Sequence, residues 1–381
     1  MPDKVTWITV QSPPLIPRKF GTLPPIATSL ISSGYNTKGR SVVLQSLSHP
    51  CISGNMLTDR FERVHDYLRI SLTDTCNLRC VYCMPEEKIK CMPHSQLMTV
   101  EEIEQLARIF VSKGVRKIRL TGGEPLARKD AGEIIQRLSR YPVELTLTTN
   151  GIFADQYLDL FLKAGIRSLN VSLDTLNPAS FFALTKRDLW DKTWRNIMLL
   201  MDAGLHVKTN TVVMKGVNDF EIVDFVALTK NLPIHVRFIE FMPFQGNQWE
   251  HDQVFPANQM LELISEQFSF IKLLDGKNDT AKKFKVLNHE GTFAIISTMS
   301  QHFCAGCNRM RLTADGKMKN CLFSQSEVDL LGALRSGQEI EPLIQFCLDL
   351  KERALGGQLL PDYEKIDAGA LKNRSMIAIG G

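Results

Sequence analysis

Three cysteines early in the chain have a spacing that suits an iron–sulfur cluster. Cys76, Cys80 and Cys83 lie in the run DTCNLRCVYCMPEE with the pattern C-x3-C-x2-C. Three thiolates can hold three irons of a 4Fe–4S cluster, which leaves the fourth iron open to an outside ligand. Structural zinc is the alternative, with His94 as a fourth ligand eleven residues later. The spacing favours the cluster.

A second trio lies near the C-terminus in the run FCAGCNRMRLTADGKMKNCLF and consists of Cys304, Cys307 and Cys321. Its pattern is less specific. Three ligands again leave room for an open iron, but zinc with His302 as fourth ligand is an equal alternative from the residues alone. The two trios hold six of the nine cysteines without secretory features, which favours a reducing compartment.

Basic residues stand where phosphate recognition would need them. Arg309 and Arg311 follow the second trio on alternate positions, so in an extended segment both guanidinium groups point the same way. Such a pair suits a phosphate, and a solvated strand face is the alternative. Four more cations lie inside strand-like runs, where burial without a partner is costly: Arg69, Arg119, Lys208 and Arg237.

The elements that must position these residues alternate along the chain. Strand-like runs begin at Tyr67, Lys117, Glu144, Ser168, Val207 and His235. Helical patterns separate them; the clearest starts after Thr99, with Glu102 completing a capping box and Gly114 as its stop. This rhythm predicts an α/β fold with a parallel sheet, either doubly wound or a barrel, with ligands at the carboxyl ends of the strands.

Three regions are expected. Residues 59–268 carry the β–α rhythm, and residues 269–381 form a smaller C-terminal domain that begins with a hairpin, FKVLN and GTFAIIST. Residues 1–58 hold five basic residues against one acidic residue and seven of the seventeen prolines. This composition resembles an organelle transit segment, and a disordered tail is the alternative. We expect the mitochondrial matrix as the location, and otherwise the cytoplasm.

Charge and hydropathy exclude two classes of partner. Beyond residue 58 the chain balances 40 basic residues with 40 acidic residues, which argues against a broad nucleic-acid surface. No run of eighteen apolar residues exists, so we expect no membrane-spanning helix.

Two motifs together resemble the radical S-adenosylmethionine (SAM) superfamily. One is the first cysteine loop with an aromatic residue, Tyr82, before its last cysteine, and the other is GGEP within Thr121–Leu126. Within that superfamily the chain resembles the molybdenum-cofactor biosynthesis protein A family, the GTP 3',8-cyclases, in eukaryotic form. This resemblance covers residues 60–381 and is carried by LRISLTDTCNLRCVYCMP, KIRLTGGEPL, TTNG, NVSLD, VRFIEFMPF and FCAGCNRMRLTADGKMKNCLF.

The resemblance implies an incomplete (β/α)6 TIM-like barrel with a C-terminal iron–sulfur domain, two 4Fe–4S clusters and SAM. One electron would split SAM on the first cluster, and the 5'-deoxyadenosyl radical would remove the hydrogen at C3' of GTP. Attack of C3' on C8 gives (8S)-3',8-cyclo-7,8-dihydroguanosine 5'-triphosphate in the first step of molybdenum cofactor biosynthesis. The second cluster would contact the guanine. Implied partners are a one-electron reductant, a downstream cyclic pyranopterin monophosphate synthase and a second copy in a homodimer.

The resemblance also implies site residues. Contacts with SAM would come from Tyr82, Gly123, Glu124, Ser172 and Met242. Contacts with GTP would come from Arg69, Arg119, Thr148, Lys208, Arg237, Arg309, Met310 and Arg311. The chain departs from the family after GGEPL, where Ala127, Arg128 and Lys129 replace a bulky residue and an arginine pair. Contacts from that loop are therefore not carried over.

The chain ends in Gly380 and Gly381, as the family does. Two glycines allow a tail without side chains to enter a narrow pocket, so we expect both to assist turnover; an inert, frayed end is the alternative. Two other functions stay open on the sequence. One is a different two-cluster radical SAM reaction, such as peptide modification, and the other is a zinc-stabilised binding module.

Overall fold

Six parallel strands occupy the centre of one sheet in the computed structural model, which describes residues 56–84 and 91–380. The β–α rhythm predicted all six. They are β1 (Tyr67–Ser71), β2 (Lys117–Thr121), β3 (Glu144–Thr149), β4 (Ser168–Ser172), β5 (His206–Val213) and β6 (His235–Glu240). Their order in the sheet follows their order in the chain, which is the order of a barrel and not that of a doubly wound sheet.

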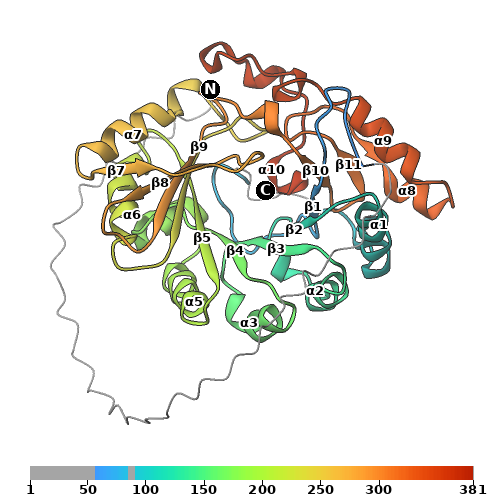
Figure 1. Ribbon diagram of the computed structural model, residues 1–381, viewed down its shortest axis with the longest axis horizontal. Helices are drawn as coiled ribbons and strands as arrows, with labels where there is room; N and C mark the ends of the chain where they lie inside the picture. Colours follow the sequence, from blue (N-terminus) through green and yellow to red (C-terminus); the bar gives the residue numbers. More distant parts are fainter. Residues whose placement is uncertain (1–55, 85–90, 381) are drawn as a thin grey trace, which may run out of the picture. The chain divides into compact units, whose positions relative to one another are not determined.

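Helices connect these strands, and α1, α2, α3 and α5 lie outside the curve of the sheet (Figure 1). The bounds are α1 (Val100–Ser112), α2 (Ala131–Leu138), α3 (Ala154–Lys163), α4 (Pro178–Thr185), α5 (Trp190–Asp202), α6 (Ile222–Leu228) and α7 (Ala257–Ser265). The predicted capping box is confirmed, because Thr99 and Glu102 exchange side-chain and backbone hydrogen bonds. Gly114, which follows α1, has a φ of +93°.

The C-terminal segment extends this sheet at both edges. Its strands are β7 (Phe270–Lys272), β8 (Lys282–Val286), β9 (Thr292–Ile296), β10 (Arg309–Leu312), β11 (Lys317–Lys319) and β12 (Val328–Asp329). The predicted hairpin is β8 and β9, and β9 pairs parallel with β6. On the other side β10 pairs parallel with β1. The sheet order runs from β12 to β7 and is open, so the barrel is incomplete. The domain boundary at residue 268 stays a prediction.

Three short helices complete the C-terminal segment: α8 (Leu330–Arg335), α9 (Glu341–Asp349) and α10 (Met376–Ile379). Helix α10 lies inside the curve of the sheet (Figure 1). This helix is thus placed against the concave face, where the sequence motifs converge.

Alternation along the strands decides which side chains reach that concave face. Leu68 and Ile70 of β1 are fully buried in the main hydrophobic core, which includes apolar residues of α1 and α2. Successive strand residues point to opposite sides, so Arg69 points inward. The same pattern on β2 buries Ile118 and turns Arg119 inward. Burying the apolar rows under helices therefore leaves the polar rows to line the interior.

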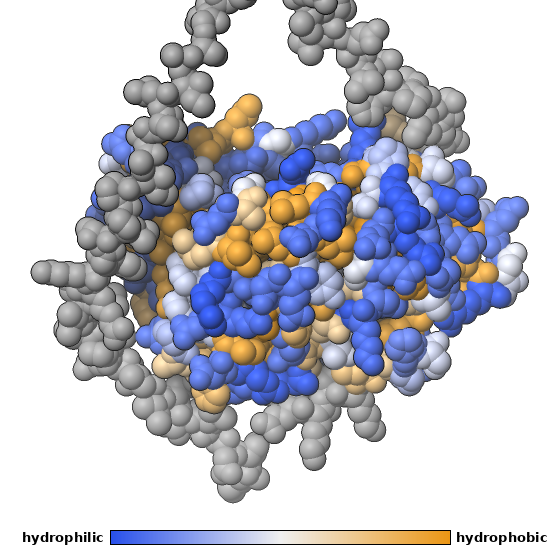
Figure 2. Space-filling view, turned by 90° about the horizontal axis from the view of Figure 1, so that it is seen from below, coloured by the Kyte–Doolittle hydropathy of each residue, from blue (hydrophilic) through white to orange (hydrophobic). Residues whose placement is uncertain are grey.

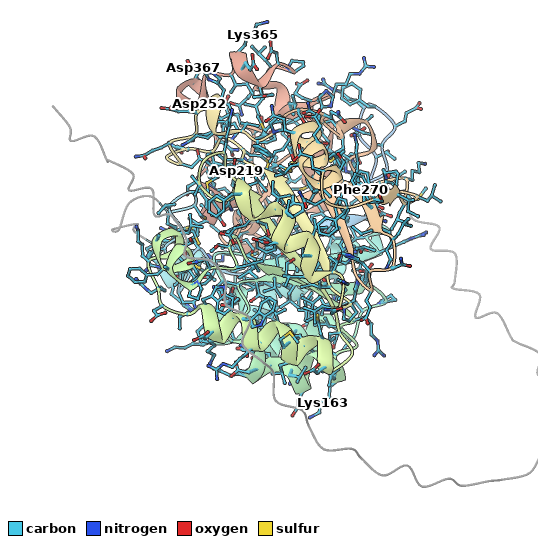
Figure 3. The ribbon with its side chains drawn as sticks, turned by 90° about the vertical axis from the view of Figure 1, so that its left-hand side faces the viewer. Lys163, Asp219, Asp252, Phe270, Lys365 and Asp367 are labelled. Atoms are coloured by element: carbon cyan, nitrogen blue, oxygen red, sulfur yellow. The ribbon has the colours of Figure 1, made fainter. Side chains whose placement is uncertain are left out.

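The face of the molecule seen from below is mostly polar (Figure 2). In the view from below, hydrophilic residues surround a smaller hydrophobic area (Figure 2). Charged side chains such as Lys163, Asp252 and Lys365 lie at the periphery when the molecule is seen from its left side (Figure 3). In the described part of the chain no helix is both long enough and apolar enough to span a bilayer.

Candidate active site

The first cysteine trio lies on the loop after β1 and lines a cavity of about 180 Å³. Glycines let the next loop approach it closely. A Cβ on Gly123 would lie 2.4 Å from the carbonyl oxygen of Thr75, and one on Gly122 would lie 2.6 Å from that of Thr73. Only glycine avoids these clashes. Ser172, at the end of β4, lines the same cavity.

Two hydrogen bonds prepare Cys76 for the thiolate form. Its Sγ accepts from the backbone N–H of Leu78 at 3.4 Å and from Nδ2 of Asn150 at 3.9 Å. Burial nevertheless raises the pKa of Cys76 to about 11, and that of Cys83, with the nearby Cys76 and Asp174, to about 12. A bound metal group is therefore needed to hold these sulfurs as thiolates.

Tyr82 ties the cysteine loop to the opposite side of the cavity. Its hydroxyl donates to Oδ2 of Asp174 at 2.7 Å, while Oδ1 accepts from the backbone N–H of Val212 at 2.9 Å. Tyr82 and Asp174 both line the cavity. In the sequence, Asp174 stands out only as the polar residue that follows a strand in NVSLD. Its role as the hydrogen-bond partner of Tyr82 was not predicted.

Glu124 does not line this cavity. It is fully buried, and its carboxylate accepts hydrogen bonds from the backbone N–H of Leu126, the Thr149 hydroxyl and the backbone N–H of Asn150. Burial raises the pKa of Glu124 to about 7. The family resemblance implies Glu124 as a contact of SAM. In the structure its carboxylate oxygens accept hydrogen bonds within the fold, so the side chain links the ends of β2 and β3.

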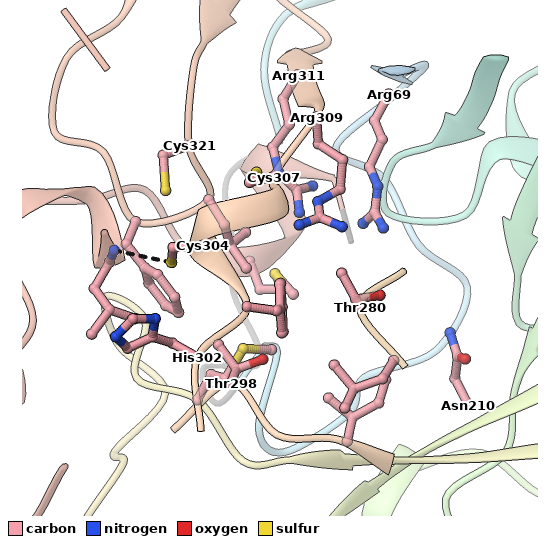
Figure 4. A pocket seen from close by; sticks show the side chains of 18 of the residues that line it. Arg69, Asn210, Thr280, Thr298, His302, Cys304, Cys307, Arg309, Arg311 and Cys321 are labelled. Atoms are coloured by element: carbon pink, nitrogen blue, oxygen red, sulfur yellow. Dashed lines mark hydrogen bonds between the residues drawn. The ribbon is translucent and has the colours of Figure 1, made fainter. Parts of the chain in front are cut away.

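The second trio lines another cavity, of about 170 Å³ (Figure 4). Cys304 Sγ accepts a hydrogen bond from the backbone N–H of Leu355 at 3.3 Å. Burial alone would raise the pKa of Cys307, but the nearby cations Arg309 and Lys351 lower it to about 6. Burial raises the pKa of Cys304, so the lowering belongs to Cys307, the cysteine next to the two cations.

The donor sets fit iron–sulfur clusters better than single ions. Among the described residues, no three Cys, His, Asp or Glu side chains lie close enough to share one metal ion. Neither His94 nor His302 belongs to such a group there. Each trio instead surrounds a cavity and has N–H donors on a sulfur, which suits a larger group held by three thiolates.

Three arginines stand side by side across neighbouring strands. Parallel pairing sets Arg69 of β1 opposite Arg311 of β10 on one side and opposite Arg119 of β2 on the other. In-register residues of parallel strands point to the same face. Figure 4 shows the guanidinium groups of Arg69, Arg309 and Arg311 directed into the cavity of the second trio. The prediction that Arg309 and Arg311 point the same way is confirmed.

A third cavity, of about 250 Å³, continues the basic lining toward the first residues of the strands. Arg119, Lys208 and Arg237 line it, and Arg237 also lines the cavity of the second trio. The Nε and Nη2 atoms of Arg237 and the Nε of Arg69 are buried without a partner in the described structure. Ligands of a parallel sheet usually bind at the carboxyl ends of the strands. These cations lie nearer the first residues of the strands, because they come from mid-strand positions.

These cations repel one another. Burial and Arg237 lower the pKa of Lys208 to about 8, and burial with neighbouring arginines lowers the pKa of Arg69. Although burial raises the pKa of Tyr67, Arg119 and Arg69 lower it to about 7. Within the described ranges, none of the six forms an ion pair: Arg69, Arg119, Lys208, Arg237, Arg309 and Arg311. The interior is thus a site for a polyanion.

The remaining implied residues divide between cavity and core. Thr148 lines the cavities of both trios, and Met242 lines that of the second. The side chain of Met310 is fully buried in the hydrophobic core, because it alternates with the two arginines and points to the other face, and its contact with GTP stays a prediction. Asn170 and Asn210 line the cavities from mid-strand positions and were missed, since an asparagine in a strand gives no distinct signal.

The C-terminal tail reaches the row of arginines. Arg311 Nη1 donates to the carbonyl oxygen of Gly380 at 2.6 Å, and Gly380 has a φ of +82°. A Cβ there would lie 2.7 Å from Oγ1 of Thr121 and 2.9 Å from Cβ of Ser71. Gly380 is therefore required by both conformation and space. Gly381 lies outside the described residues.

The loop that departs from the family has a structural function. Arg128 is buried; it donates to the backbone carbonyls of Leu72 and Met98 at 2.7 and 2.8 Å and pairs with Asp130. Its guanidinium therefore faces the cysteine loop's root and the start of α1 rather than either cavity.

Solved structures with a similar fold include two that have S-adenosylmethionine (AdoMet) bound. Streptococcus suis SuiB bound to S-adenosylmethionine matches with a TM-score of 0.53 at 16% identity, over 75% of this chain and 68% of that chain. Native anSMEcpe with bound AdoMet matches with a TM-score of 0.52 at 14% identity, over 82% of this chain and 94% of that chain. At these identities the likeness shows the fold alone.

Sequence relatives are closer. Residues 70–229 match the Radical SAM superfamily, and residues 234–355 match Molybdenum Cofactor Synthesis C. The chain is 45% identical to molybdenum cofactor biosynthesis protein 1 of Mus musculus over 90% of its length, and it spans about half of that protein (54%). It is 40% identical to the GTP 3',8-cyclase of Pelotomaculum thermopropionicum over 85% of this chain and 100% of that protein. It is 47% identical to the mitochondrial GTP 3',8-cyclase of Arabidopsis thaliana over 86% of this chain and 84% of that protein. Because these last two matches extend over most of both chains, the chain belongs to the GTP 3',8-cyclase family of radical SAM proteins.

Proposed function

We propose that the chain is a radical SAM GTP 3',8-cyclase, which converts GTP to its 3',8-cyclised dihydro form for molybdenum cofactor biosynthesis. One observation carries the proposal: the cavities of the two cysteine trios are adjoining, with Thr148, Asn210 and Ile239 lining both. A cofactor on the first trio and a nucleotide beside the second would therefore meet at these residues.

The surrounding residues support a division of roles. When bound, SAM and the first cluster supply a 5'-deoxyadenosyl radical. The cations next to the second trio bind and orient a triphosphate, since converging guanidinium and ammonium groups suit dispersed phosphate charge. Asn210 lies at the junction, where the ribose would be placed. A peptide substrate would leave these cations without partners, so peptide modification is disfavoured.

Several partners belong to the proposal. Each trio would hold one 4Fe–4S cluster, which gives two clusters per chain. An outside reductant would supply the one electron that splits SAM. A cyclic pyranopterin monophosphate synthase consumes the product, and a homodimer is part of the proposal. The Arabidopsis thaliana relative is named as mitochondrial, and with the basic composition of residues 1–58 this supports the mitochondrial matrix.

The test uses anaerobically reconstituted protein with SAM and a one-electron reductant. Formation of 5'-deoxyadenosine should depend on GTP and be accompanied by a cyclised guanine nucleotide. ATP, which carries the same triphosphate, is the matched control and should not replace GTP. Equal formation of 5'-deoxyadenosine with and without GTP would reject the cyclase.

A further inference from the structure

A lysine outside every sequence motif lies against the second trio. Lys351 follows α9 and is 2% exposed. Its Nζ donates to Cys307 Sγ at 3.6 Å, to the backbone carbonyl of Arg309 at 3.2 Å and to that of Asn320. An ammonium group has three N–H donors, so these three acceptors use all of them.

The charge on Lys351 has no carboxylate partner in the described part of the chain. His65, which lies near Lys351, offers no free carboxylate there, because its partner Asp59 is already paired with Arg63. Lys319 offers the contrast: it is 1% exposed and pairs with Glu327 at 3.4 Å. A buried cation is costly unless an opposite charge compensates it. For Lys351 that charge is the thiolate of Cys307 and whatever the trio binds.

The cation nearest the first trio does not donate to a sulfur: the Arg79 guanidinium donates to the backbone carbonyls of Cys76 and Leu78. The donors to its sulfurs are the neutral N–H groups of Leu78 and Asn150. Among the described residues no lysine or arginine donates to a sulfur there, and the carboxylates of Asp174 and Glu124 lie near. In the described structure an ammonium group therefore donates to a sulfur of the second trio, while carboxylates and a guanidinium that donates elsewhere lie near the first.

We infer that Lys351 is a positioning residue that holds a positive charge on Cys307 and raises the reduction potential of the cluster on the second trio. The inference rests on the proposed function, because it requires a cluster on each trio. Reduction adds one electron from the outside reductant to the cluster. A cation hydrogen-bonded to a ligand sulfur stabilises the more negative, reduced state.

Lys351→Met tests this, because it keeps an unbranched side chain but removes the charge and the N–H donors. Holoenzyme is titrated potentiometrically under anaerobic conditions and followed by EPR. Two one-electron waves are expected, and the first cluster is the one whose EPR spectrum responds to SAM. In the variant the other wave should move to lower potential, so that its reduced-to-oxidised ratio at fixed potential falls about tenfold, or ~59 mV.

Lys319→Met is the matched control, since Lys319 is equally buried nearby but makes no hydrogen bond with a cysteine sulfur. Because Lys319 lies near Cys321 but is paired with Glu327, this substitution should move the potential of the second cluster by clearly less than Lys351→Met does and should leave the first unchanged. If Lys351→Met holds two clusters and neither reduction potential changes, the inference is overturned while the proposed function stands. A single wave with about four irons per native chain would instead overturn the two-cluster proposal.

A second measurement tests the inference in the case where the Lys351→Met variant does not hold the second cluster. Native holoenzyme labelled with 15N-lysine should show, by pulsed EPR, a coupling from one lysine nitrogen to the reduced cluster that does not respond to SAM. No lysine coupling in the native enzyme would overturn the inference without any substitution.

Discussion

Arg69→Met should weaken GTP binding without weakening the fold. Arg69 lies between Arg311 and Arg119 on neighbouring strands, and its buried Nε has no partner in the described structure. Methionine preserves an apolar stem of similar length beside Tyr67. The substitution therefore removes a charge and N–H donors and creates no large cavity.

The two effects have opposite signs. One charge-assisted hydrogen bond contributes about 1.5–3 kcal/mol, so losing one to a phosphate weakens GTP binding roughly 10- to 150-fold. Like charges on adjacent strands destabilise by about 0.2–1 kcal/mol per pair, so the metal-free, GTP-free variant should be as stable as the native chain or slightly more stable. A residue that served only the fold would lower the free energy of unfolding instead.

Calorimetric titration with GTP and with guanosine measures the loss of phosphate binding, and denaturant unfolding measures the change in stability. GTP affinity should fall while guanosine affinity changes little, because guanosine has no phosphate. Arg108→Met, at an exposed position of α1, is the matched control and should change neither quantity. GTP affinity within twofold of native, or a clear loss of stability, would refute the reasoning.

Three further predictions concern other parts of the site. Lys208 has a pKa lowered to about 8 by burial and neighbouring cations, and a bound triphosphate favours its charged form. GTP affinity should therefore decline as the pH rises through 7 to 8, because Tyr67 in the same cavity becomes anionic near 7 and Lys208 loses its charge near 8. Lys208→Met should bind more weakly and lose the part of the decline near pH 8, and an identical pH profile in titrations of both proteins would contradict it. Tyr82→Phe leaves Oδ2 of the buried Asp174 without its donor, so unfolding of the metal-free protein should cost about 1–3 kcal/mol less by denaturant titration, and equal stability would argue against that bond. Gly380→Ala places a Cβ 2.7 Å from Oγ1 of Thr121 and should displace the tail from Arg311. Cyclised product should then be lost while iron content stays native, and full activity would show the tail to be dispensable.

Local patterns predicted the six β–α units well, because strand and helix periods are properties of neighbouring residues. The pairing of β10 with β1 and of β9 with β6 could not be predicted in this way. These strands lie far apart in the chain, and neither carries a signal for its partner. That pairing brings the second trio to the same interior as the first.

Individual residues show the same limit. Strand alternation already separates Met310 from Arg309 and Arg311, so its burial in the core could have been predicted. For Glu124 the motif gave the position, but not the three internal donors that occupy its carboxylate. Lys351 is one of many lysines in the sequence, and only the fold shows that it is buried against Cys307.

The central claim is that a radical formed at the first trio reaches a GTP molecule held beside the second trio in the adjoining cavity. The most direct measurement follows deuterium from C3' of labelled GTP during anaerobic turnover with SAM. The account predicts deuterium in 5'-deoxyadenosine, together with a cyclised nucleotide that has lost it. GTP-dependent 5'-deoxyadenosine free of deuterium would contradict the account.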